Sequence, residues 1–119
     1  MKTILVVEDE EVLREIFKDE LTEAGYHVFT SGDAKDCFQK LSTVKIDLLI
    51  LDIKLPDLSG LELLEKIRKK YPDLPIIMAT AYDSFRTDFS IWVANVSDYI
   101  VKPVDLGVLK EKVKKIIGV

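Results

Sequence analysis

Residues 46–60 read IDLLILDIKLPDLSG, and this segment indicates the fold class of the chain. Its four consecutive apolar residues, Leu48 to Leu51, are typical of a strand that is covered on both faces of a parallel sheet. Asp52 follows the apolar run directly, and Pro56 and Gly60 mark a loop after it. Ligands of open parallel sheets bind outside the carboxyl ends of the strands, so Asp52 is a candidate functional residue.

The rest of the chain repeats this alternation of apolar runs and helical patterns. The first helical pattern stops at Gly25, the third begins with a capping box formed by Ser59 and Glu62, and the last begins at Asp105. Alternating strands and helices predict one α/β domain over residues 1–119, with a parallel sheet and helices on both faces. The expected strands are residues 3–7, 26–30, 47–51, 75–80 and 98–101.

Composition excludes several classes of protein. With 48% hydrophobic and 32% charged residues, the 119-residue chain has the balance of a soluble globular domain. A net charge of -4 argues against direct nucleic-acid or membrane-surface binding. The apolar runs are too short to span a bilayer, and the first ends in acidic residues unlike a signal peptide. A single cysteine, Cys37, and a single histidine rule out an internal disulfide framework and the usual zinc sites, and suit a cytoplasmic protein.

Polar residues follow four of the expected strands. The first strand ends in Glu8 and Asp9, the third in Asp52, the fourth in Thr80 and the fifth in Lys102. Each residue alone has an ordinary explanation, such as an acidic helix start, a turn aspartate or a surface lysine. If the strands are neighbours, however, all of these side chains meet at one edge of the sheet.

Such a cluster suits phosphoryl chemistry. Neighbouring carboxylates repel each other, and Mg²⁺, which prefers oxygen ligands, relieves that repulsion. A carboxylate can attack phosphorus and form an aspartyl phosphate. The charge on the transferring group is then compensated by a metal ion, a lysine and a hydroxyl group, and the cluster offers a candidate for each.

The segments ILVVEDE, LLILDIKLPDLSG, PIIMATAY and DYIVKP stand in this order along the chain. In sequence and spacing the chain resembles the receiver domain of two-component response regulators over almost its whole length. The resemblance implies a flavodoxin-like, doubly wound sheet of five parallel strands in the order 2-1-3-4-5. It also implies a signalling switch that catalyses only its own phosphorylation and dephosphorylation, rather than an enzyme.

The resemblance assigns the phosphoacceptor and metal-binding roles. Asp52 would accept a phosphoryl group from the phosphohistidine of a histidine kinase or histidine phosphotransfer domain. Asp9 and Asp52 would bind Mg²⁺ directly, Glu8 would reach the ion through water, and the backbone carbonyl of Lys54 would be a further ligand. Glu8 stands where the family more often has aspartate, so we expect its geometry to differ while metal binding survives.

The resemblance also assigns the switch. Thr80 would hydrogen-bond the phosphoryl group, Lys102 would pair with it, and Tyr99 would turn inward when Thr80 moves. The Lys102–Pro103 peptide bond would be cis. Phosphorylation would then alter a surface formed by the fourth helix, fifth strand and fifth helix, which would act on a downstream protein or on an output domain outside this sequence. We expect a monomer or weak dimer.

Within that surface, the helix expected over residues 85–95 is poor in strong helix formers, since Thr87, Ser90, Ile91 and Val93 all have lower helix propensity than alanine or leucine. The sequence therefore predicts a short, frayed or displaced helix there.

Two alternatives remain open from the residues. The first is an aspartate-nucleophile phosphohydrolase, although such enzymes often carry a second acid where Lys54 stands here. The second is a phosphorylation-independent interaction module of pseudo-receiver type, against which the retention of every key residue type argues.

Overall fold

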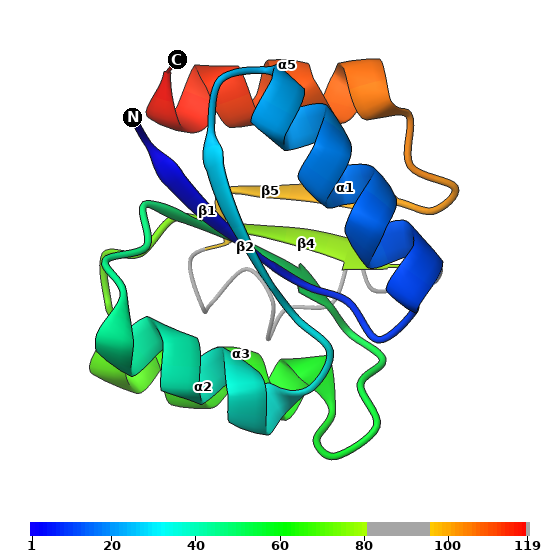
Figure 1. The fold of residues 1–119 in the computed structure, drawn as a ribbon. Helices are drawn as coiled ribbons and strands as arrows, with labels where there is room; N and C mark the ends of the chain where they lie inside the picture. The colour runs from blue at the N-terminus through cyan, green and yellow to red at the C-terminus, as the bar shows by residue number, and fades with distance from the viewer. Residues whose placement is uncertain (81–95, 119) are drawn as a thin grey trace.

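A computed structural model describes residues 1–80 and 96–118, which form a five-stranded sheet in the order β2-β1-β3-β4-β5 (Figure 1). All neighbouring strands are parallel, which confirms the expected fold. The helix predicted over residues 85–95 lies outside the described residues. The strands are β1 (Thr3–Val7), β2 (His27–Ser31), β3 (Leu48–Asp52), β4 (Ile76–Thr80) and β5 (Asp98–Val101).

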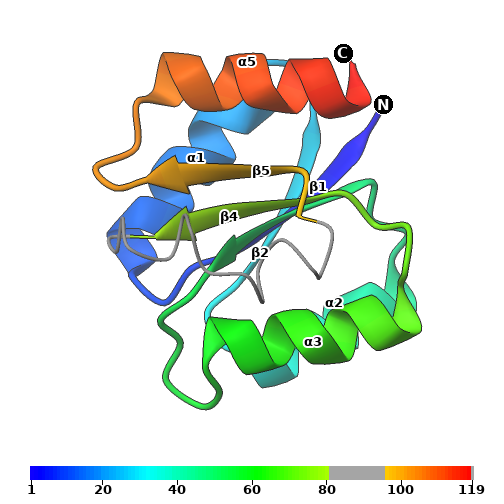
Figure 2. The ribbon, with the colours of Figure 1, turned by 180° about the vertical axis from the view of Figure 1, so that it is seen from behind.

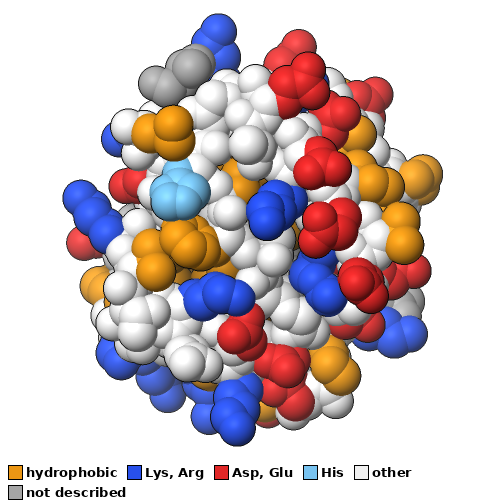
Figure 3. Space-filling view, viewed as in Figure 1, with side chains coloured by type: hydrophobic (Ala, Val, Ile, Leu, Met, Phe, Trp, Pro, Cys, Tyr) orange, Lys and Arg blue, Asp and Glu red, His pale blue; other side chains and the backbone are white. Residues whose placement is uncertain are grey.

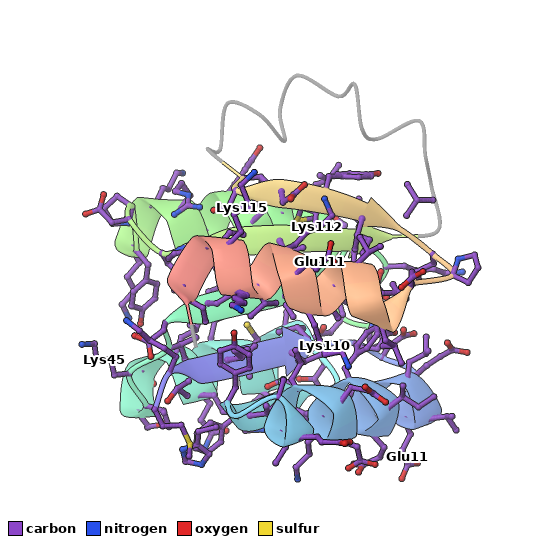
Figure 4. All side chains as sticks on the ribbon, turned by 90° about the horizontal axis from the view of Figure 1, so that it is seen from above. Glu11, Lys45, Lys110, Glu111, Lys112 and Lys115 are labelled. Atoms are coloured by element: carbon purple, nitrogen blue, oxygen red, sulfur yellow. The ribbon has the colours of Figure 1, made fainter. Side chains whose placement is uncertain are left out.

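Helices cover both faces of the sheet. In Figures 1 and 2, α1 and α5 lie on one face, and α2 and α3 lie on the other. Lys110 of α5 reaches across to Glu20 of α1, with 3.1 Å between the ammonium and a carboxylate oxygen (Figure 4). Among the helices of the described residues, none has the length and apolar character needed to cross a membrane. The helices are α1 (Glu11–Glu23), α2 (Ala34–Thr43), α3 (Gly60–Lys70) and α5 (Leu106–Ile117).

The central strands bury side chains on both faces. In β3, Leu49 and Leu51 belong to the core cluster beneath α2 and α3, whereas Leu48 and Ile50 belong to the cluster beneath α1 and α5. All four are at most 1% exposed. This two-sided burial explains why the apolar run of residues 48–51 is uninterrupted, since successive strand side chains point to opposite faces.

Helix starts follow the predicted capping signals. The Ser59 hydroxyl accepts a hydrogen bond from the Glu62 amide at 3.2 Å, and an Asp105 carboxylate oxygen accepts one from the Val108 amide at 3.1 Å. These bonds satisfy backbone donors that have no partner within the first turn of a helix. After α1, Gly25 takes a positive φ of 103°, a conformation that glycine adopts without strain.

Candidate functional site

The order of the strands brings the predicted polar residues to one edge of the sheet. Because β1, β3, β4 and β5 are successive neighbours, their carboxyl ends lie side by side. Glu8, Asp9 and Asp52 each direct a carboxylate oxygen into a common cluster, and these oxygens lie within 4.8 Å of one another. Lys102, just after β5, completes the cluster. The predicted convergence is therefore present for these four residues.

Asp52 lies at the carboxyl end of the central strand, where burial and hydrogen bonds fix its side chain. The residue is 4% exposed. One carboxylate oxygen accepts a hydrogen bond from the backbone amide of Lys54 at 3.2 Å, and the other lies 3.2 Å from the ammonium of Lys102. Asp52 is thus held by two donors at the rim of the sheet.

Lys102 bridges two acids. Its ammonium group forms ion pairs with Glu8 and Asp52, and the lysine side chain is mostly buried. Burial by itself would lower the pKa of Lys102, but the hydrogen bond to Glu8 and the charge of Asp52 together raise that pKa above its ordinary value. Lys102 therefore carries its positive charge throughout the physiological pH range.

Glu8 is the most deeply buried acid of the cluster, at 1% exposure. Burial raises the pKa of its carboxyl group to about 7, although the hydrogen bonds from Lys102 and from the Glu10 amide oppose the shift. The charge of Asp52 and the contact with Asp9 add to the increase. Ionisation of the Glu8 carboxyl group is thus unfavourable unless the cluster gains further positive charge.

The cluster fits a magnesium ion. Its three carboxylates and one ammonium leave a net charge of minus two when all are ionised, which a divalent cation neutralises. All three acids offer oxygen ligands, the type that Mg²⁺ prefers, and Mg²⁺ commonly keeps several waters beside one or two carboxylates. Asp9 is exposed, so the cluster is open to solvent on that side. The donor set, the charge and the access are all those of a hydrated divalent cation site.

The remaining predicted residues lie at or near the same edge. Thr80 is the last residue of β4 and pairs with Val101 in β5, but its side chain lies outside the part of the chain that the structure describes. Tyr99 in β5 is 4% exposed and belongs to the core cluster beneath α2 and α3. The Lys102–Pro103 peptide bond is cis.

The loop after Asp52 is held at two points, one at Gly60, which the sequence marked, and one at Asp57, which sequence reasoning missed. The Gly60 amide donates to the Ile53 carbonyl at 2.5 Å. The carboxylate of Asp57 accepts hydrogen bonds from the Ala34 and Lys35 amides at 2.9 and 3.1 Å, and these bonds, led by the one from Ala34, lower the pKa of Asp57. The loop that follows the candidate acceptor is therefore fastened to the start of α2.

Arg14 is a further residue that the sequence did not single out. Its guanidinium donates to the backbone carbonyl oxygens of Glu8 and Asp9 at 2.9 and 3.0 Å. In the sequence, only the charge of Arg14 could have drawn attention to it, because it is the one basic residue among the acidic residues at the start of α1. Acidic side chains gather over α1 (Figure 3), and their exposed members are Glu11, Glu15, Asp19 and Glu23.

A family model described as the response regulator receiver domain matches residues 4–114. Among curated relatives, response regulator RR06 of Streptococcus pneumoniae is 35% identical over 114 residues, which cover 96% of this chain and 52% of the relative. The chain spans about half the length of this and the next such regulators that it matches. A chemotaxis protein CheY homolog of Campylobacter jejuni is 39% identical over 121 residues, covering 97% of this chain and 92% of the relative.

Solved structures show the same similarity. Response regulator protein TrrA of Thermotoga maritima, crystallised in complex with Mg²⁺-BeF, superposes with a TM-score of 0.90 at 46% sequence identity. The match covers 98% of this chain and 99% of that one. A second crystal structure holds TrrA in complex with the histidine kinase ThkA and superposes with a TM-score of 0.89.

Proposed function

This chain belongs to the response regulator receiver domain family of two-component signalling, and from that premise we propose that Asp52 is its phosphoacceptor. The observation that carries the proposal is the position of Asp52 at the end of the central strand, with Lys102 and two further acids around it. A receiver domain is a signalling switch and not an enzyme with a separate substrate.

The transfer step uses a carboxylate oxygen of Asp52 as nucleophile. This oxygen forms a bond to the phosphorus of a phosphohistidine while the phosphorus–nitrogen bond breaks. The electron pair of that bond stays on the imidazole nitrogen, and the product is an aspartyl phosphate. The ammonium of Lys102, 3.2 Å from Asp52, supplies positive charge next to the transferring group. The Lys54 amide, which contacts the other oxygen, holds the carboxylate in position.

We infer that Glu8, Asp9 and Asp52 hold Mg²⁺, with the backbone carbonyl of Lys54 as a further ligand. When bound, Mg²⁺ neutralises negative charge on the carboxylates and on the phosphoryl oxygens. The Mg²⁺-BeF complex of TrrA, 46% identical to this chain, supports the choice of ion. Asp9, as the exposed member, is the ligand that entering ions meet first.

The donor and the response are proposed from the same relatives. A histidine kinase or histidine phosphotransfer domain supplies the phosphoryl group, as the complex of TrrA with ThkA suggests. Phosphorylation then shifts an equilibrium between two conformations through Thr80 and Tyr99 and alters the face that includes β5 and α5. The output is a further domain of a longer regulator or a separate target protein. We place the domain in the cytoplasm, where a free cysteine such as Cys37 stays reduced.

Incubation with acetyl phosphate and Mg²⁺ tests the acceptor. We expect the intact mass to rise by one phosphoryl group, and Asp52→Asn or an excess of EDTA to abolish the gain. Asp47→Asn is the matched control, because Asp47 lies at the opposite end of β3, bonded to the Thr3 amide at 2.8 Å. A wild-type protein that gains no mass indicates an interaction module instead. Rapid repeated turnover of acetyl phosphate indicates a phosphohydrolase.

A further inference from the structure

Glu8 and Asp9 are consecutive residues, yet their carboxylates share one cluster with oxygens within 4.8 Å. Successive side chains of a strand point to opposite faces of the sheet, so an uninterrupted strand would separate the two carboxylates. β1 ends at Val7, although the Glu8 amide still donates to the Ser31 carbonyl at 3.0 Å. The chain therefore leaves the strand conformation just where the acids begin, and the Glu10 amide donates to the Glu8 carboxylate across this turn at 3.1 Å.

Arg14 makes a second contact at this turn, to the backbone of both residues. One nitrogen of its guanidinium, Nη1, donates to the carbonyl oxygens of both Glu8 and Asp9, at 2.9 and 3.0 Å. In a strand, successive carbonyl groups point in opposite directions, so two successive carbonyls that meet one nitrogen fix a turn. The backbone of Arg14 is itself held in place, because its amide donates to the Glu10 carbonyl at 3.0 Å in the first turn of α1.

Gly32 leaves room for the guanidinium. A Cβ atom added at Gly32 would lie 2.8 Å from Nη1 of Arg14 and 3.4 Å from its Cζ atom. Among the described residues, the glycines with positive φ are Gly25 and Gly118, so the backbone at Gly32 also suits alanine. An alanine at this position would therefore disturb the guanidinium and not the backbone conformation.

We propose that Arg14 is a positioning residue for the metal site, which holds the turn at Glu8 and Asp9 so that both carboxylates face one Mg²⁺ ion. Arg14 does not itself touch the ion or the phosphoryl group. The inference rests on the proposed function only in taking Mg²⁺ as the ion.

Electrostatic repulsion alone predicts the opposite change in Mg²⁺ affinity when Arg14 is removed. The direction of the measured change therefore tests the proposal. A guanidinium near a cation site repels the cation, so removal of its charge should tighten Mg²⁺ binding. If Arg14 instead holds the ligands in place, its removal weakens Mg²⁺ binding, since loss of outer contacts to metal ligands typically lowers metal affinity by roughly 10-fold to 100-fold.

Calorimetric titration with MgCl2 alone, without any phosphodonor, measures this effect. We expect Arg14→Ala to raise the dissociation constant for Mg²⁺ by about 10-fold or more, and Arg14→Lys to recover part of the loss. The matched control is Lys18→Ala, which removes one positive charge from an exposed position on the same helix and should change the constant by less than about twofold. Arg14→Ala protein that binds Mg²⁺ as tightly as the wild type, or more tightly, overturns the proposal.

Gly32→Ala tests the same contact with Arg14 present, which covers the case that Arg14→Ala does not fold. We expect it to weaken Mg²⁺ binding in the wild-type background but to add no further loss to Arg14→Ala, because both changes break one contact. Unchanged Mg²⁺ binding in Gly32→Ala alone overturns the proposal, and where Arg14→Ala folds, equal effects of Gly32→Ala in both backgrounds overturn it as well. Failure of the wild type to bind Mg²⁺ would contradict the proposed function instead, so the two failures are distinguishable.

Discussion

Lys102 and Glu8 form the pair on which the electrostatics of the site depend. Glu8 is almost fully buried and keeps its charge only at the expense of desolvation, and Lys102 compensates part of that cost while it also contacts Asp52. The pKa of Glu8 is raised mainly because burial disfavours its charged form, and Lys102 offsets only part of that effect. A bound divalent cation would favour the charged form of Glu8.

The pKa of Glu8 predicts a pH dependence of stability in EDTA. Its folded-state value of about 7 exceeds the ordinary value of 4.5, so between these values the folded protein binds more protons than the unfolded chain. The stabilisation that comes from proton binding at Glu8 is thus complete below pH 4.5 and is lost as the pH rises through 7. The free energy of unfolding falls by at most about 3 kcal/mol over this range. Urea unfolding at about pH 5 and pH 8 measures the loss.

Glu8→Gln is the control for that measurement, because glutamine keeps the shape of the side chain without its titration. We expect the free energy of unfolding of this variant to vary less with pH than that of the wild type. Wild type and variant with the same pH dependence would show that Glu8 does not titrate as described.

The place of the acids and the lysine in the cluster could be predicted from the sequence, whereas the contacts of Arg14 and Asp57 could not. The difference lies in the groups that these side chains contact. Glu8, Asp52 and Lys102 follow apolar runs, and the carboxyl ends of parallel strands meet at one edge. Arg14 and Asp57 act on backbone carbonyls and amides, which every residue has, so no pattern of side-chain types marks the partner. Asp57 and the Ala34 amide that it binds are 23 residues apart.

The loop between β3 and α3 depends on Gly60. A Cβ atom there would lie 2.4 Å from the Asp52 carbonyl oxygen and 2.4 Å from the Ile53 Cα atom, both backbone atoms that cannot move aside cheaply. The close approach allows the Gly60 amide to reach the Ile53 carbonyl. This contact fixes the path of the chain immediately after Asp52.

We predict that Gly60→Ala lowers the free energy of unfolding by at least about 2 kcal/mol, because the added methyl group displaces backbone atoms. Urea unfolding measures the change. Gly107→Ala in α5 is the control, since among the described residues its Cβ would meet only a side-chain oxygen of Asp105 at 3.2 Å, and alanine favours the helix by up to about 1 kcal/mol. Equal stability of the Gly60 variant and the wild type would contradict the close packing of this loop.

The described strands and helices followed the sequence pattern closely, with differences of one residue at some strand ends. β2 begins at His27 and not at Tyr26 as expected, because the Tyr26 amide donates to the Leu21 carbonyl at the end of α1. β3 extends to Asp52, which pairs with Ala79 in β4. Such ends depend on tertiary hydrogen bonds, which the periodicity of side chains does not record.

The order of the strands is a property of the molecule as a whole and was implied by the family resemblance, not by local patterns. Apolar periodicity predicts that a segment is a strand, but it does not say which strands are neighbours. The consequence for function is large, because only an order that places β1, β3 and β5 near one another brings Glu8, Asp52 and Lys102 together.

Binding of Mg²⁺ at the acidic cluster should stabilise the entire domain, since its three acids lie at the ends of two strands of one sheet. A ligand at 100 times its dissociation constant adds about 2.7 kcal/mol to the free energy of unfolding when it binds only the folded state. We predict a stabilisation of this order by MgCl2, which EDTA reverses, and a smaller one in Asp9→Asn. Sodium chloride at matched ionic strength is the control, and equal stabilisation by both salts would contradict a specific site.

Chemical mapping of the phosphoryl group tests the role of Asp52. After incubation with acetyl phosphate and Mg²⁺, reduction with borohydride converts a phosphorylated aspartate into homoserine, and peptide mass spectrometry locates the product. We predict homoserine at position 52 alone, because Asp52 is the acid that Lys102 and the Lys54 amide hold at the end of the central strand. Homoserine at position 9, or a phosphoryl group retained on the protein with Asp52 unmodified, would contradict this assignment.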